Sequence, residues 1–88
     1  MSEFVLELYV SRNDAGGAER CAKRMRQAAA ELTREGREVR CVQRIFLPEE
    51  ETCLLLCEAE SAAAVRDAAR RAGLDFERVS ASLAEERA

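Results

Sequence analysis

Two glutamates, two arginines and a tyrosine are the side chains that could bind a ligand or move a proton. They are Glu7, Tyr9, Arg40, Arg44 and Glu58, and each lies in a segment with the pattern of a β-strand. A partly buried glutamate beside a second carboxylate would have a raised pKa, which suits proton transfer. The alternative is that the glutamates pair with the arginines across strands and fix the register of a dimer.

The four cysteines offer thiol chemistry. Cys53 and Cys57 are four residues apart in one expected strand, about 13 Å at ~3.3 Å per residue, so they cannot share a metal ion or a disulfide within one chain. Cys41 and Cys57 could stand opposite each other, close enough for a disulfide under oxidation. Cys21 lies on the apolar stripe of an expected helix. With no histidine and no CxxC motif, most zinc sites, Cys-His nucleophiles and Ser-His-Asp triads are excluded, and we expect the cysteines to act as small buried hydrophobes.

Six segments must position these side chains. The apolar periodicities predict strands over 3–10, 38–47, 52–59 and 76–83, and helices ending near 35 and 72. Asn13 or Asp14 is expected to cap the first helix, although two glycines weaken its first turn and move the expected start towards Ala18. Ser61 should cap the second helix. Gly36 and a second glycine at 73 are typical residues just after a helix.

The expected strand over 52–59 is apolar on both faces. One row holds Cys53, Leu55 and Cys57, and the other holds Leu54 and Leu56. A strand of an antiparallel sheet normally shows one face to water, whereas fully burying a leucine is worth roughly 1.5–3 kcal/mol. The helices can cover one row, and we expect a second copy of the chain or a ligand to cover the other.

The order of elements, β-α-β-β-α-β, predicts an α+β fold, the ferredoxin-like sandwich. Its four-stranded antiparallel sheet carries both helices on one face, and we expect it to dimerise through the open face. Residues 1–88 are expected to form a single domain, with an ordered core over about 3–83 and a polar tail over 84–88.

The register of the hairpin near Pro48 decides which side chains share a face. We expect a turn of odd length, which directs Cys41 and Ile45 towards the helices with the row of Cys53. The opposite face would then carry ten residues, namely Val5, Glu7, Tyr9, Arg40, Val42, Arg44, Phe46, Leu54, Leu56 and Glu58. A slip of one residue would exchange the two rows.

Charge and hydropathy exclude several classes of partner. The formal net charge is −3, and charges of both signs are mixed along the chain, so a dedicated nucleic-acid or anionic-membrane binder is not expected. The sequence has neither a tract of about 18 apolar residues nor the features of a signal peptide. We therefore expect a cytoplasmic protein with reduced thiols.

Three segments resemble a bacterial family of small proteins of unknown function. They read EFVLELYV from position 3, FLPEEET from position 46, and EA at 58–59 followed by AVRDAARRAG from position 64. The resemblance covers about 3–83, and the Ala- and Arg-rich composition is similar to actinobacterial members. It implies a ferredoxin-like fold, often dimeric, and at least one nickel-binding relative. Imidazole is a favoured nickel ligand and this chain has no histidine, so we assign no metal ligand and the cofactor stays unknown.

Three functions fit these features. The favoured hypothesis is a binding module that holds a small-molecule ligand or a metal ion at the open sheet face of a homodimer. The second is an enzyme of the dimeric α/β-barrel type, with Glu7 or Glu58 as base and Tyr9 or Arg44 holding an oxyanion. The third is a structural or accessory role, in which the apolar face meets only a partner protein.

Overall fold

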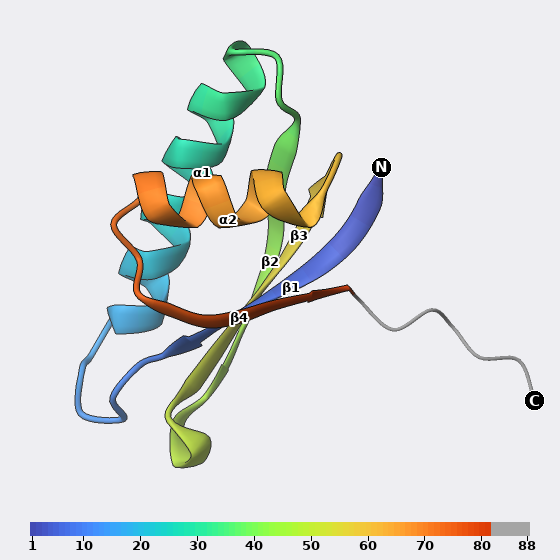
Figure 1. Ribbon diagram of the computed structural model, residues 1–88. Helices are drawn as coiled ribbons and strands as arrows, with labels where there is room; N and C mark the ends of the chain where they lie inside the picture. The colour runs from blue at the N-terminus through green and yellow to red at the C-terminus, as the bar shows by residue number, and fades with distance from the viewer. Residues whose placement is uncertain (82–88) are drawn as a thin grey trace, which may run out of the picture.

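A computed structural model describes residues 1–81 of the chain (Figure 1). The elements follow in the order β1 (Ser2–Tyr9), α1 (Gly17–Arg34), β2 (Val39–Leu47), the 3-10 turn η1 (Pro48–Glu50), β3 (Thr52–Ala59), α2 (Ala62–Arg71) and β4 (Phe76–Ala81). The order β-α-β-β-α-β confirms the predicted ferredoxin-like α+β fold. The end of the predicted fourth strand at 82–83 and the predicted polar tail at 84–88 lie outside the described residues.

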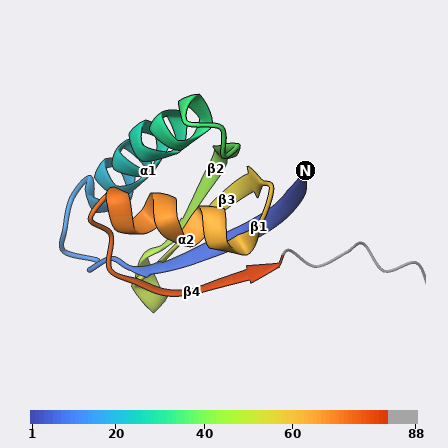
Figure 2. The same ribbon diagram turned by 45° about the horizontal axis from the view of Figure 1, so that its top comes forward.

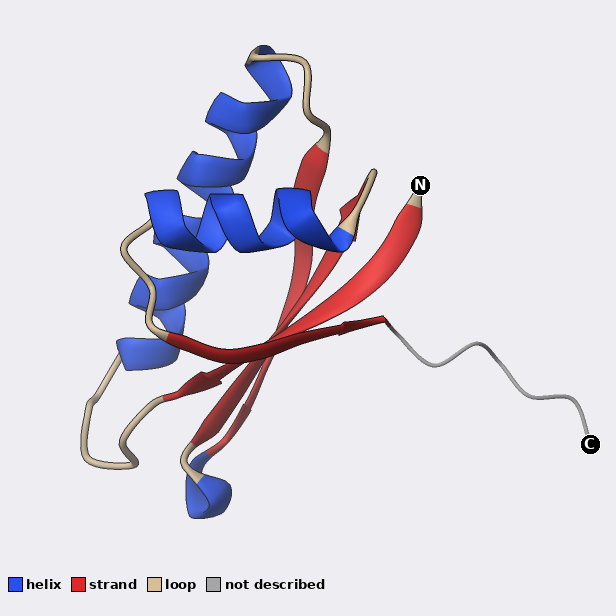
Figure 3. Cartoon of the chain, viewed as in Figure 1, coloured by secondary structure: helices blue, strands red, loops and turns tan. Residues whose placement is uncertain are grey.

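The four strands form one antiparallel sheet in the order β2-β3-β1-β4, so β1 and β3 are central. Both helices lie on the same side of this sheet, with α2 crossing over the middle and α1 over the side of β2 (Figures 1 and 2). The cartoon coloured by secondary structure shows the two layers, helices on one side and strands on the other (Figure 3). The opposite face of the sheet has no element of residues 1–81 on it.

The core lies between the helices and one face of the sheet. Alternate residues of the central strands are fully buried there, including Leu6 and Leu55, as the two-residue period of a strand requires. Met25 of α1 and Val65 of α2 are also completely buried against them. Alanines fill much of the remaining helix surface, which lets the helices pack closely on the sheet. One of the two apolar rows predicted for β3 is therefore covered by the chain's own helices.

Local chemistry explains most of the helix boundaries. The hydroxyl of Ser61 accepts a hydrogen bond of 3.1 Å from the backbone N–H of Ala64, which confirms the predicted cap of α2. Gly36 and Gly73 follow the two helices with φ of 96° and 72°, the left-handed conformation that glycine adopts without strain. The predicted side-chain cap of α1 is wrong: Gly16, with φ of 77°, occupies the N-cap and no side chain caps it.

The hairpin between β2 and β3 departs from the predicted register. Leu47 pairs with Thr52 across a loop of four residues, so the predicted odd-length turn is wrong. The register then shifts between Cys41 and Gln43, where Val42 forms a β-bulge. One extra residue in a strand reverses the facing of everything beyond it. Beyond the bulge, Cys41 therefore lies opposite Cys57, which is the pairing that the odd-length turn predicted.

Candidate functional site

The face of the sheet turned away from the helices, which we call the open face, has an apolar centre. Its apolar residues are Val5, Val42, Ile45, Leu47, Leu54 and Leu56. In the single chain Leu54 and Leu56 are half-buried by their neighbours, while Val42 and Leu47 on the edge strand are 49% and 41% exposed. An apolar patch of this kind on a small protein usually marks an interaction surface.

Two ion pairs border this apolar centre on opposite sides. Arg40 on β2 lies 2.9 Å from the carboxylate of Glu58 on β3, and Arg78 on β4 lies 3.2 Å from that of Glu7 on β1. The first is the cross-strand pairing that the sequence offered as an alternative to a ligand site. Exposed pairs of this type are worth about 0–1 kcal/mol each. Each pair neutralises its own two charges within the chain.

The two glutamates that were candidates for a shared proton lie in different parts of the face. Glu7 is opposite Leu54, which is four residues from Glu58 along β3. That separation is about 13 Å at ~3.3 Å per residue, too far for one carboxylate to perturb the other directly. Each instead has an arginine as its neighbour. The arrangement favours ion pairing over a role as a general base.

Tyr9 belongs to the hairpin end of the sheet. Its hydroxyl donates to the carboxylate of Glu51 at 3.2 Å, and the backbone N–H of Arg12 donates to the same oxygen at 3.1 Å. These hydrogen bonds, the one from the Arg12 backbone first, hold the pKa of Glu51 below its usual range. Glu51 itself has a φ of 51° and closes the loop after η1. Tyr9 therefore orders this loop while its ring stays 60% exposed.

Arg44 does not share a face with the other predicted site residues. It pairs with the buried Leu55, so the four-residue hairpin loop directs it to the helix side of the sheet. There it lines a small cleft with Asp14 and Gly16 at the start of α1. Phe46 was predicted on the open face but also lies on the helix side and packs against the core. Ile45 moves the other way, to the open face.

Of the five predicted site residues, the structure thus brings Arg40 and Glu58 into contact and leaves Glu7, Tyr9 and Arg44 apart. Sequence reasoning missed Arg78, the partner of Glu7. The signal was present, because Arg78 alternates with Val79 and Ala81 in the weak fourth strand.

The described residues do not fit a nickel site. Among residues 1–81, no group of three or more histidine, cysteine, aspartate and glutamate side chains is placed to hold a metal ion. The cysteines also lie on the helix side of the sheet or on α1, away from the charged residues of the open face. Within the same residues, no helix is both long and apolar enough to cross a membrane.

The chain is similar in structure to SCO4226, an actinobacterial protein from Streptomyces coelicolor A3(2) whose crystal structure has been analysed. The TM-score is 0.71 and the sequences are 20% identical, over 96% of this chain and 100% of that one. At this identity the likeness shows the fold alone. No protein-family model matches the chain, and no curated protein matches it.

Proposed function

We propose that the protein is a small binding module in which the open faces of two copies lie against each other and hold an organic ligand between them. The observation that carries this proposal is the apolar centre of the open face, with Leu54 and Leu56 half-buried in the single chain. Burying the rest of these side chains releases water and stabilises the pair of chains. A domain of 88 residues gains more from such burial than a large one does.

The charges of the face support a second copy as the partner. Arg40 and Glu58, like Glu7 and Arg78, neutralise each other within one chain. These four side chains therefore do not need a partner of opposite charge, and a second copy brings no uncompensated charge from these pairs to the interface. A nucleic acid or an acidic peptide would instead require a basic surface.

The ligand would have a mainly apolar body and a few polar groups. Small-molecule sites are mostly apolar with a small number of placed polar side chains. Between two open faces, the leucines would contact the body of the ligand, and the Arg40–Glu58 and Glu7–Arg78 pairs would meet its polar groups. The described residues give no comparable reason to propose a metal ion.

Sedimentation velocity tests the interface. In Leu54→Asp a carboxylate replaces an apolar side chain at the centre of the open face, so the variant should sediment as a folded monomer while the wild type sediments as a dimer. Gln27→Asp is the matched control, because Gln27 is exposed on α1 on the other side of the molecule, and it should remain dimeric. A dimer that survives Leu54→Asp would show that the interface lies elsewhere, and circular dichroism would establish that each variant is folded.

A further inference from the structure

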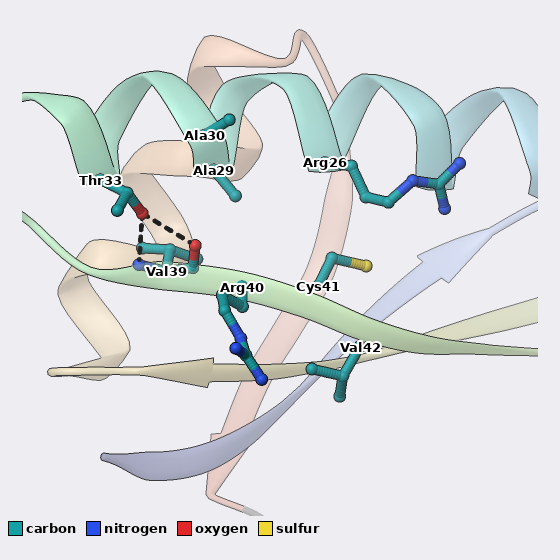
Figure 4. A pocket seen from close by; sticks show the side chains of 8 residues that line it. All are labelled: Arg26, Ala29, Ala30, Thr33, Val39, Arg40, Cys41 and Val42. Atoms are coloured by element: carbon teal, nitrogen blue, oxygen red, sulfur yellow. Dashed lines mark hydrogen bonds between the residues drawn. The ribbon is translucent and has the colours of Figure 1, made fainter.

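A second region whose side chains could take part in a reaction lies on the helix side of the sheet, away from the open face. Cys41 lines a cleft of about 520 Å³ between α1 and the edge strand β2, together with Arg26 and Thr33. Figure 4 shows the sulfur of Cys41 on the α1 side of β2, while Arg40 and Val42 point away from the helix. A neighbouring cleft of about 400 Å³ shares Arg26 and Cys41. Cys41 is thus a half-buried thiol where two surface hollows meet.

Cys41 stands directly opposite Cys57 on β3. Residues that face each other in an antiparallel ladder have Cα atoms about 4.5–5.5 Å apart, which falls within the range of about 4.4–6.8 Å that a disulfide requires. The Cα spacing of the two cysteines therefore allows a disulfide between them. They differ in access, because Cys57 is only 1% exposed whereas Cys41 opens to the cleft.

The surroundings favour a thiolate at Cys41. The facing thiol of Cys57, the positive charge of Arg26 and the backbone N–H of Gln43 hold the pKa of Cys41 below its usual value, against the opposing effect of partial burial. The N–H of Gln43 belongs to the bulge around Val42. For Cys57, the neighbouring Cys41 thiol and burial raise the pKa, and its own S–H donates to the backbone carbonyl of Leu55 at 3.8 Å. The lowered pKa of Cys41 and the raised pKa of Cys57, together with the access of Cys41 to the cleft, favour Cys41 as the nucleophile of the pair.

The other cysteines lack this arrangement. Cys53 is fully buried opposite Phe46, and burial is the main cause that raises its pKa to about 11. Cys21 lies on α1, outside the sheet. Neither stands opposite a second thiol in the sheet.

The charges around the two clefts indicate the class of reactant. Arg26 and Arg44 both line the second cleft with Cys41, and within residues 1–81 neither makes an ion pair. Unpaired arginines beside a reactive group attract anions and speed their association. A disulfide that carries carboxylates suits this site better than a neutral or cationic one.

We infer that Cys41 and Cys57 form a dithiol site that reduces small anionic disulfides. The thiolate of Cys41 attacks one sulfur of the disulfide, the S–S bond breaks, and the leaving thiolate takes a proton from water. Cys57 then attacks the sulfur of Cys41, forms the Cys41–Cys57 bond and releases the second small thiolate, which accepts the proton of Cys57. The protein loses two electrons and two protons, and the disulfide becomes two thiols.

Oxidised glutathione is the probe, and intact mass with peptide mapping is the readout. The wild type should gain the Cys41–Cys57 disulfide and retain no glutathione. Cys57→Ala cannot complete the second step and should retain one glutathione on Cys41, whereas Cys41→Ser should do neither. Cys53→Ala is the matched control and should react as the wild type does. A wild type without the Cys41–Cys57 bond, or a Cys57→Ala variant without glutathione on Cys41, would overturn the inference.

The charge of the reactant is tested with cystamine, a cationic disulfide. At low ionic strength, oxidised glutathione should react with Cys41 about tenfold faster than cystamine does. Arg26→Gln combined with Arg44→Gln should reduce this preference. Equal rates for the two disulfides with the wild type would contradict an anionic reactant. Because Cys41 and Cys57 face the helices, these results do not depend on whether the open face binds a second copy.

Discussion

Adjacent leucines on β3 allow the two faces of the sheet to be tested separately. Leu55 is completely buried beneath the helices, whereas Leu54 is half-buried on the open face. Truncating a fully buried leucine to alanine costs about 2–5 kcal/mol. Leu55→Ala should therefore lower the free energy of unfolding by that amount at every protein concentration.

Leu54→Ala should lower the free energy of unfolding of the single chain by less, because Leu54 is only half-buried until a second copy covers it. Fully burying a leucine is worth about 1.5–3 kcal/mol, so the dilute single chain should lose only about 1 kcal/mol. Completing the burial in a twofold dimer adds about 1 kcal/mol per chain, or about 2 kcal/mol for the pair, which is a rise of about 30-fold in the dissociation constant.

Urea unfolding of both variants at low and high protein concentration gives the free energies of unfolding. Sedimentation equilibrium gives the dissociation constant of the dimer. If Leu54→Ala destabilises the dilute chain as much as Leu55→Ala does, then Leu54 packs in the core and the two rows of β3 do not face the sides described above. If the dissociation constant is unchanged, the open face is not the interface.

Three further predictions concern caps and charges. Ser61→Ala removes the cap of α2 and should cost about 1 kcal/mol of unfolding free energy in urea titrations, with Ser80→Ala as a control that should cost less. Hydrogen bonding to Arg37 lowers the pKa of Asp67, so this carboxylate stabilises the fold above the unfolded-state pKa of about 3.9 and loses its effect as the pH falls through the lower folded-state pKa. The difference in Tm between the wild type and Asp67→Asn should accordingly be present at pH 7 and vanish in acid, and a difference independent of pH would contradict this origin. The pH midpoint for alkylation of Cys41 by iodoacetamide should lie below the ordinary thiol pKa. Cys57→Ala should raise that midpoint, because the neighbouring thiol that lowers the pKa of Cys41 is lost; an unchanged midpoint would mean that the two thiols do not interact.

The fold was predictable because its signals are local or periodic. The doubly apolar strand over 52–59 marked β3 as central, and Ser61, Gly36 and Gly73 marked helix ends through hydrogen bonding and backbone conformation. The failed prediction at the start of α1 has a physical reason as well. Asp14 forms an ion pair with Arg20, and a glycine takes the left-handed N-cap position.

The candidate site was only partly predictable because a β-bulge has no sequence signature here. Val42 lies between Cys41 and Gln43 without a glycine or proline, yet its insertion keeps Arg40 on the open face, whereas the four-residue loop alone directs Arg44 to the helix side. Arg40 could be placed because it lies beyond the bulge, where the four-residue loop and the extra residue compensate each other.

The same bulge explains why the thiol site was seen only in part. The sequence placed Cys41 opposite Cys57, but the positions of Arg26 and of the Gln43 N–H depend on how α1 packs on a kinked edge strand. Packing between segments that are far apart in the chain produces no periodic pattern in the sequence.

Native mass spectrometry of the protein, purified without an affinity tag, tests the proposed binding module most directly. We expect the mass of two chains, with added mass where the ligand is retained between the open faces. A single-chain mass at concentrations well above the micromolar range would contradict it, since the apolar centre around Leu54 would then remain open to water.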